Sequence, residues 1–307
     1  MTKVIVVGGV AGGATAASQL RRLNPDAEIT VYEQYKEISY GSCGMPYHIS
    51  GEVATRDSLV NMTPEKFSQK DINVLTNHEV LSVDTQNNTV TVLNKVTGSE
   101  LTDSYDYLIV SPGGSPKVLP ALQNTPQTFS LNKIEDLDYL MAFIDNHDIK
   151  EAVIVGSGFI GLEVTENLTE RGIHVTMLQH DDRIYKNIEA EMNSVLYDAI
   201  KQHNVDLKQN TQIDKIEGTT AHLSNGETIA APLIISGTGI SPNTAFLKSS
   251  GIHLNDKGFI PNNKFGLTNI DNVYALGDAV VTHYQHIPDL PMHSALAWPA
   301  HRLAHII

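Results

Sequence analysis

Two segments of the chain follow one plan, and this repeat limits the possible folds more than any other feature. "VIVVGGVAGGATAASQLRRL" (residues 4–23) and "AVIVGSGFIGLEVTENLTERG" (residues 152–172) each combine an apolar run, a glycine turn and a helical stretch. Each leads into a second run rich in β-formers, "EITVYEQ" or "HVTMLQH". Neither first run alternates apolar and polar residues, as expected for strands buried on both faces. The repeat predicts two βαβ units, typical of doubly wound parallel sheets.

Each unit is followed by a stretch that alternates apolar and polar residues between Asn/Gly turns. These stretches are "VLSVDTQNNTVTVLNKVTGSELTDSYDYLIVSPGG" and "IDKIEGTTAHLSNGETIAAPLIISGTG", and both predict antiparallel meanders. Apolar strands near residues 108–110 and 233–236 each end in a glycine-bearing turn. The sequence therefore predicts an α/β chain with two Rossmann-like domains, each carrying an antiparallel β-meander.

Composition excludes several classes of function. A length of 307 residues suggests about two domains, and no apolar run approaches the ~18 residues of a spanning helix. The net charge is −14, without a basic cluster beyond Arg21–Arg22, which argues against nucleic-acid binding. A single cysteine excludes an internal disulfide, and the first apolar run is too short for a signal peptide. We expect a cytoplasmic protein that binds neither membrane nor nucleic acid.

The first glycine turn has the form of a dinucleotide site with one departure. Gly8 and Gly13 keep the spacing of the motif and Gly12 opens the helix, but Val10 replaces the middle glycine. Glu33 lies at the end of the second strand, where a carboxylate can accept hydrogen bonds from ribose hydroxyls. The alternative is a packing turn followed by a solvated glutamate.

The second glycine turn is complete. Gly156, Gly158 and Gly161 supply the tight turn, the close approach to a pyrophosphate and the helix–strand contact of that motif. The following strand ends in Gln179 and His180 instead of an acid. Loss of the acid removes repulsion against a 2′-phosphate.

Basic residues near the end of that strand also favour a 2′-phosphate. His180, Arg183 and Lys186 are available to meet a phosphate. We expect NADPH at this turn, and NADH stays possible because Asp181 and Asp182 argue against a phosphate.

A third segment, "TNIDNVYALGDAV" (residues 268–280), predicts a strand that ends in Gly277 and Asp278 before a helix. An aspartate at such a turn can accept a hydrogen bond from a ribityl hydroxyl. By spacing alone it is an ordinary strand end.

The only cysteine stands in "SYGSCGMPY", between two glycines. Free cysteines are often buried and pack as small apolar residues, which is one explanation for Cys43. Pro46 suits the first turn of a helix, and Cys43 then lies at or just before the helix N-terminus, where free N–H groups stabilise a thiolate. Gly41 and Gly44 leave room for a flat ring against the sulfur.

Taken together, these motifs resemble the FAD-dependent pyridine nucleotide–disulfide oxidoreductases over the whole chain. Their order is the FAD loop, a meander, "SPGG" (residues 111–114), the NAD(P) loop, "GTGISPN" (residues 237–243) and the second FAD motif. The resemblance implies an FAD domain interrupted by an inserted NAD(P) domain. The implied ranges are 1–112 and 244–307 for FAD and 113–243 for NAD(P).

The cysteine indicates the branch of that family. Members with an internal disulfide carry C-x4-C, but His48 stands five positions after Cys43. Oxidase and peroxidase members carry a histidine just before the glycine pair, where this chain has Ala11. The chain is more similar to coenzyme A–disulfide reductases of the staphylococcal type, through Ser39–Pro46, "TPEKF" (residues 63–67) and "LAWPAHR" (residues 296–302).

The resemblance implies that NADPH reduces FAD and that the flavin reduces a Cys43–S–S–CoA mixed disulfide. The freed thiolate then attacks the next coenzyme A disulfide. Phe159 matches an aromatic residue over the nicotinamide and Glu163 an acid beside it, although helix packing and a solvated charge would explain both. The alternatives are an NADH oxidase or peroxidase, a persulfide or polysulfide reductase, and a remnant that only binds flavin.

Substrate residues are expected on the first helix. Thr15, Gln19 and Arg22 share one helical face, on which a guanidinium can hold phosphates. Similar enzymes bind coenzyme A with these positions and with Ser39, Ser42 and a lysine near Lys70, where this chain is one residue shorter. An ordinary solvated helix face is the alternative.

Two features argue against further partners. The pairs His283/His286 and His301/His305 have metal-like spacing, but no carboxylate or cysteine completes a site, and no metal is expected. The resemblance also implies a dimerisation domain after "AHRLAHII", whose tyrosines complete the partner's site. Without it, we expect a compromised homodimer and an apolar patch near residues 296–307.

Overall fold

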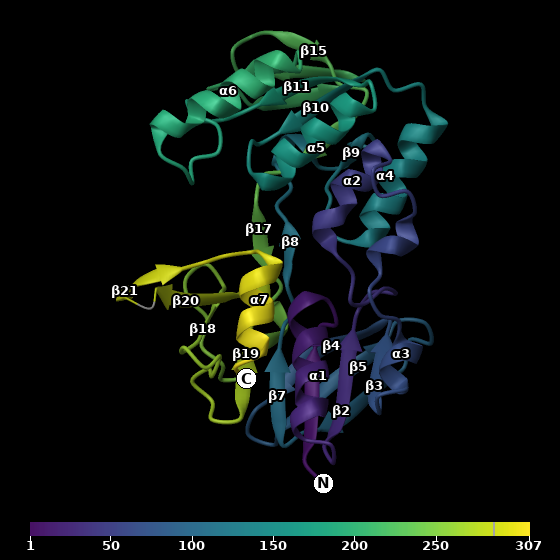
Figure 1. Ribbon diagram of the computed structural model, residues 1–307, viewed down its shortest axis with the longest axis vertical. Coiled ribbons are helices and arrows are strands. Elements are labelled where there is room, and N and C mark those ends of the chain that lie inside the picture. Colours follow the sequence, from purple (N-terminus) through teal and green to yellow (C-terminus); the bar gives the residue numbers. More distant parts are fainter. Residues whose placement is uncertain (285) are drawn as a thin grey trace. The chain divides into compact units, whose positions relative to one another are not determined.

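The chain folds into two units, which are described separately. The structure is a computed structural model that describes residues 1–284 and 286–307; of residues 283, 284, 288 and 289 only the backbone is described. The first unit comprises Met1–Gly41, Val60–Ser115 and Ser241–Ile307, and the second comprises Ser42–Leu59 and Pro116–Ile240 (Figure 1). No helix of the described residues is long and apolar enough to cross a membrane.

A five-stranded sheet forms the centre of the first unit, in the order β19-β7-β1-β2-β3, with every neighbouring pair parallel. Helix α1 (Ala11–Leu23) connects β1 to β2, which confirms the first predicted βαβ unit. The strands are β1 (Lys3–Val7), β2 (Glu28–Glu33), β3 (Ile72–Thr76), β7 (Tyr107–Val110) and β19 (Val273–Ala275).

The predicted first meander is confirmed as the antiparallel sheet β4-β5-β6. Its apolar face joins the core of the parallel sheet through Val80, Val83, Val90 and Val92, which are all buried. A second small sheet has the order β18-β20-β21, and α7 lies along α1. The bounds are β4 (His78–Asp84), β5 (Thr89–Asn94), β6 (Glu100–Ser104), β18 (Ile260–Pro261), β20 (Val280–Tyr284), β21 (Ile287–Met292), α3 (Pro64–Ser68) and α7 (Ala297–Ala304).

The helix predicted after Asp278 is wrong. A single 3-10 turn, η6 (Gly277–Ala279), follows the strand and leads directly into β20. Val280, Val281 and Thr282 begin that strand, and β-branched side chains lose rotamer freedom in a helix but fit a pleated sheet. The chain therefore continues as a strand.

The second unit repeats the plan with a parallel sheet in the order β12-β11-β10-β16-β9. Helix α5 (Phe159–Glu170) connects β10 to β11, and the predicted second meander is the antiparallel sheet β13-β14-β15. The strands are β9 (Thr128–Phe129), β10 (Glu151–Val155), β11 (His174–Leu178), β12 (Asp206–Lys208), β13 (Ile213–Glu217), β14 (Thr220–Leu223), β15 (Thr228–Ala230) and β16 (Ile234–Ser236); the other helices are α2 (Met45–Ser50), α4 (Ile134–Asn146) and α6 (Asn193–Gln202). Strands β8 (Gly114–Pro116) and β17 (Ile240–Pro242) form a two-stranded sheet.

The segment after the cysteine belongs to the second unit, where α2 lies against α5. Ser50 Oγ donates to Asn167 Oδ1 at 2.6 Å, and Arg171 donates to the Ile49 carbonyl oxygen at 3.0 Å. The two doubly wound units with their meanders agree with the predicted fold class. The assignment of FAD to 1–112 and 244–307 and of NAD(P) to 113–243 stays a prediction.

Candidate functional site

The glycines of the first turn leave no room for a Cβ atom. A Cβ added to Gly8, whose φ is +93°, would lie 2.1 Å from the Ser111 carbonyl oxygen. One on Gly13 would lie 1.9 Å from the Gly8 carbonyl oxygen, and one on Gly12 would lie 2.5 Å from Leu276 Cδ1. Real Cβ atoms essentially never approach below 3.0 Å. The turn therefore packs directly against the segments that follow β7 and β19.

The segment predicted as the second FAD motif, Gly277 and Asp278, also lies beside Ser111. A Cβ on Gly277 would lie 3.2 Å from Ser111 Oγ, so Gly8, Gly12 and Gly277 all surround Ser111. They lie at the carboxyl ends of parallel strands, where open α/β sheets bind ligands. Partial burial raises the pKa of the Asp278 carboxyl above its ordinary value, and nearby His293 opposes that rise.

Glu33 is buried and already makes two hydrogen bonds. Its Oε2 accepts the Gly9 N–H at 2.8 Å, and its Oε1 accepts the Tyr35 N–H at 2.9 Å. A carboxylate oxygen can accept more than one hydrogen bond, and this is the chemistry that binds ribose hydroxyls. The residues predicted to hold FAD thus fit a dinucleotide, with tightly packed glycines beside a buried acid.

In the glycine turn of the second unit, two glycines have no room for a Cβ atom and one borders open space. A Cβ on Gly156, whose φ is +98°, would lie 2.6 Å from the Gly237 carbonyl oxygen. One on Gly161 would lie 2.0 Å from the Gly156 carbonyl oxygen, whereas one on Gly158 would meet nothing within 4 Å. Gly156 and Gly161 are therefore needed for folding, and Gly158 borders open space at the start of α5. This fits the close approach of a pyrophosphate.

The end of β11 carries an amide where related sites have an acid. Gln179 Oε1 accepts the Ser157 backbone N–H at 3.1 Å and the Ser157 hydroxyl at 2.8 Å. Lys186 Nζ lies 2.8 Å from Asp181 Oδ1, and this contact lowers the pKa of the Asp181 carboxyl. His180 is exposed beside them. Of the two aspartates that argued against a 2′-phosphate, Asp181 is thus paired with a lysine, whereas Asp182 is exposed.

Cys43 is exposed, so it is not a buried packing thiol. It lies in the 3-10 turn η1 (Ser42–Gly44), directly before α2, and Pro46 is the second residue of that helix. This confirms the predicted start of a helix. A Cβ on the neighbouring Gly44 would lie 2.6 Å from Leu59 Cδ2, so the end of that leucine side chain would have to move.

Acidic groups of α5 face the helix that follows Cys43. The charges of Glu163 and Glu166 raise the pKa of the Tyr47 phenol. Burial, and then the charge of Glu166, raises the pKa of Glu163. Phe159, at 48 % exposure, packs edge-on against Tyr185 with ring centroids 4.9 Å apart. The second unit therefore brings the cysteine segment and the two predicted nicotinamide residues onto one helix pair, α2 and α5.

The predicted substrate face of α1 is polar and partly exposed. Arg22 donates to Gln19 Oε1 at 2.5 Å, and Thr15 Oγ1 lies 2.6 Å from His301 Nδ1 of α7. Lys70 is exposed after α3, and Arg21 donates to the Asp71 carbonyl oxygen at 2.6 Å. That bond places the segment of Lys70 beside the carboxyl end of α1.

The two predicted serines lie on either side of a unit boundary. Ser39, in the first unit, has a left-handed φ of +48°, and its N–H donates to the Gly9 carbonyl oxygen at 2.8 Å. Left-handed backbone in a residue other than glycine costs about 1–3 kcal/mol and is common at functional sites. Ser42, in the second unit, is half-buried at the start of the turn that holds Cys43.

Sequence reasoning missed several contacts. The Ser157–Gln179 pair and Tyr47 carried no recognisable signal. His301 was considered only for its metal-like spacing, yet it contacts Thr15. Within the described residues, no group of three or more His, Cys, Asp or Glu could hold a metal; the His283 side chain lies outside that description.

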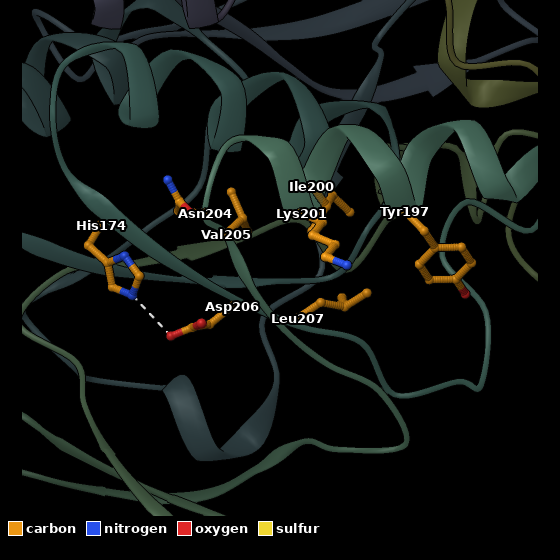
Figure 2. Close-up of a pocket in the computed structure, with 8 residues that line it drawn as sticks. All are labelled: His174, Tyr197, Ile200, Lys201, Asn204, Val205, Asp206 and Leu207. Atoms are coloured by element: carbon orange, nitrogen blue, oxygen red, sulfur yellow. Dashed lines mark hydrogen bonds and ion pairs between the residues drawn. The ribbon is translucent and has the colours of Figure 1, made fainter.

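A surface hollow of about 410 Å³ in the second unit lies elsewhere (Figure 2). His174 and Asp206, whose side chains meet at 3.0 Å, begin β11 and β12. In a parallel sheet this is the opposite edge from the glycine turn that follows β10. None of the predicted site residues lines the hollow, so it is separate from the candidate site.

The fold, the two glycine turns and the exposed cysteine are those of an oxidoreductase with two dinucleotide sites. The chain belongs to the pyridine nucleotide-disulphide oxidoreductase family, whose sequence model matches residues 2–296. This confirms the resemblance seen in the sequence, and membership implies FAD and a nicotinamide cofactor.

Individual relatives are more specific. A coenzyme A disulfide reductase of Staphylococcus aureus (strain MSSA476) is 42% identical over 308 aligned residues, which cover 100% of this chain and 70% of that protein. The structure of reduced Bacillus anthracis CoADR-RHD has a TM-score of 0.95 at 34% identity, covering 99% of this chain and 55% of that one. An NAD-dependent persulfide reductase from A. fulgidus has a TM-score of 0.93 at 28% identity, with coverages of 99% and 58%. The chain thus spans little more than half the length of these solved relatives.

Proposed function

We propose that this chain reduces coenzyme A disulfide to two coenzyme A thiols with electrons from NADPH, through a mixed disulfide at Cys43. The observation that carries the proposal is 42% identity, over the whole of this chain and 70% of the relative, to an enzyme of that name. The exposed cysteine at the start of α2 supports it. The chain holds no second cysteine, so the disulfide partner must come from the substrate.

The reaction balances with one protein thiolate. Cys43 Sγ attacks one sulfur of the substrate, the substrate S–S bond breaks, and one coenzyme A leaves as a thiolate that takes a proton. Two electrons then cleave the Cys43–S–S–CoA bond, which releases the second coenzyme A and restores the thiolate. When bound, the nicotinamide cofactor would supply these electrons as a hydride and FAD would pass them to the disulfide, while the second coenzyme A thiolate also takes a proton.

The cofactors would be held by residues from both units. The residues proposed for FAD are four tightly packed glycines and two carboxyls: Gly8, Gly12, Gly13, Gly277, Glu33 and Asp278. The nicotinamide dinucleotide residues share the turn before α5 and its first helical residues; they are Gly156, Gly158, Phe159, Gly161, Glu163 and, at the end of β11, His180.

Coenzyme A would be bound by the polar face of α1 and its surroundings. The proposed residues are Thr15, Gln19, Arg22, Ser39, Ser42 and Lys70. Arg22 and Lys70 are exposed cations on a chain of net charge −14, so they are suited to attract phosphates locally. His301, beside Thr15, extends this face.

NADPH is the proposed reductant because the first side chain after β11 is the amide of Gln179 and the next acid, Asp181, is paired, although Asp182 is exposed. Gln179 is held by Ser157, and Lys186 pairs with Asp181. A 2′-phosphate would compete with Asp181 for Lys186. Lys186→Ala should reduce the ratio of kcat/KM for NADPH over NADH, whereas Lys201→Ala in α6 should leave it unchanged. A ratio below one in the unaltered protein would favour NADH, and an unchanged ratio in Lys186→Ala would show that Lys186 does not bind the 2′-phosphate.

Persulfide reduction is the second candidate, because the A. fulgidus persulfide reductase shares the fold closely. An oxidase or peroxidase is less favoured, since Ala11 stands where such enzymes place a histidine.

The decisive experiment compares the unaltered protein with Cys43→Ser. We expect a coenzyme A adduct on Cys43 by mass spectrometry and NADPH oxidation with coenzyme A disulfide, both lost in Cys43→Ser while bound FAD is retained. Ser58→Ala, a matched control in the same segment, should behave like the unaltered protein. Turnover with polysulfide alone would support persulfide reduction, and bound flavin without any turnover would leave a flavin-binding remnant.

A further inference from the structure

His293 contacts the turn of Asp278, which is predicted to bind flavin, and it lies 15 residues further along the chain. Its Nε2 lies 3.0 Å from the Asp278 carbonyl oxygen. Its ring lies against Phe259, with centroids 4.3 Å apart and an interplanar angle of 52°. Phe259 is 8% exposed, so one side of the imidazole rests on the core of the first unit. The ring is therefore held on two sides.

The hydrogen bond fixes which nitrogen of the neutral imidazole carries the proton. A carbonyl oxygen only accepts, so the proton lies on His293 Nε2. Protonation at Nδ1 then adds a positive charge without breaking this bond.

We propose that His293 is a positioning residue for the flavin, which fixes the Asp278 turn through the Asp278 carbonyl oxygen. This inference rests on the flavin binding proposed above. Asp278 itself would contact the flavin ribityl chain, and His293 would act only through it.

The charge of His293 also acts on the Asp278 carboxyl. Burial raises the pKa of Asp278, and His293 is the group that opposes the rise. Asp256, Lys257 and His293 line a surface hollow of about 380 Å³, and all three are exposed, so solvent and salt screen their charges. Asp278 is more buried than these groups, and the charge of His293 lowers its pKa.

The direction of the pH effect follows. An ionised Asp278 accepts a hydrogen bond from a sugar hydroxyl, and a protonated one does so less well. Affinity for FAD should therefore fall as the pH drops through the pKa of Asp278. Without the imidazolium, that pKa rises further, and the fall should begin at a higher pH.

The test measures the FAD dissociation constant of the apoprotein by flavin fluorescence between pH 5 and pH 8. At pH 8, His293→Ala should bind FAD about fivefold more weakly, equivalent to about 1 kcal/mol. His293→Gln, whose amide can still donate to the carbonyl, should recover most of that affinity. In both variants the loss of affinity should begin at a higher pH than in the unaltered protein.

Controls separate this inference from the flavin proposal itself. His253→Gln, an exposed histidine of the same unit, should change nothing. In an Asp278→Asn background, His293→Gln should cause no further pH shift. If His293→Ala does not fold, His293→Gln alone decides through its pH midpoint. Unchanged affinity and midpoint in a protein that binds FAD would overturn the role of His293, whereas an unaltered protein that binds no FAD would overturn the flavin proposal.

Discussion

Glu33 Oε2 accepts the backbone N–H of Gly9 across 2.8 Å, which joins the end of β2 to the turn after β1. The side chain is 4% exposed, and its other oxygen accepts the Tyr35 N–H. A residue expected to serve a ribose therefore also holds the shape of the turn in which the dinucleotide is proposed to lie.

The first prediction concerns that double role. Glu33→Gln leaves one oxygen for two backbone donors, so a buried N–H loses its partner. We expect a loss of about 1–3 kcal/mol in the free energy of unfolding, measured in urea, and weaker FAD retention. Glu100→Gln on β6 is the exposed control and should change neither quantity. Full stability and full flavin content in Glu33→Gln would contradict this account.

The second prediction concerns Gly161 and Gly158, two glycines of the same motif that we expect to differ in their effect on stability. Gly161→Ala places a Cβ against the Gly156 carbonyl oxygen and should destabilise the second unit by about 1–3 kcal/mol or prevent folding. Gly158→Ala meets open space at a φ of −75° and should alter stability by less than about 0.5 kcal/mol. It should nevertheless raise KM for the nicotinamide dinucleotide. Thermal melts and steady-state kinetics distinguish the two, and equal stability losses would show that the open space is filled.

The third prediction uses two adjacent arginines on α1. Arg21 donates to the carbonyl oxygens of Pro25, Ala27 and Asp71, whereas exposed Arg22 bonds only Gln19 among the described partners. Arg21→Ala should lower stability by about 1.5–3 kcal/mol and raise KM for coenzyme A disulfide less than Arg22→Ala does, because Arg21 acts only through the segment of Lys70. Arg22→Ala should leave stability within about 0.5 kcal/mol and raise KM about tenfold, which is about 1.4 kcal/mol. The opposite assignment would move the substrate face elsewhere.

The fourth prediction concerns pH. The pKa of Glu163 is raised by burial and by Glu166, so the folded protein binds more protons than the unfolded chain just above the ordinary carboxyl range. The stability present at low pH is therefore lost as the pH rises through the folded-state pKa.

Glu163→Gln removes that penalty. We expect a melting temperature about 1–2 °C higher than that of the unaltered protein at pH 8 and no difference near pH 4. Activity should fall if Glu163 serves the nicotinamide. Glu170→Gln at the exposed end of α5 is the control, and a stabilisation that is equal at both pH values would refute the burial argument.

The sequence by itself determined the two βαβ units, the meanders and the family. These features depend on contiguous residues, because glycine turns and the period of apolar residues act within a few positions of the chain. The start of α2 at Pro46 followed from the same local chemistry. The family assignment followed because several local motifs occur in one order.

Only the tertiary structure decided which distant side chains meet. The contacts of Thr15 with His301, of Ser157 with Gln179 and of His293 with the Asp278 turn depend on which strands and helices become neighbours. The wrong helix after Asp278 has the same origin. The glycine–aspartate turn resembles a helix start, but the β-branched residues after it pair with β18 and β21 in a sheet assembled from separate segments. Local patterns set each element, and the free energy of packing distant elements chooses among the alternatives that those patterns leave open.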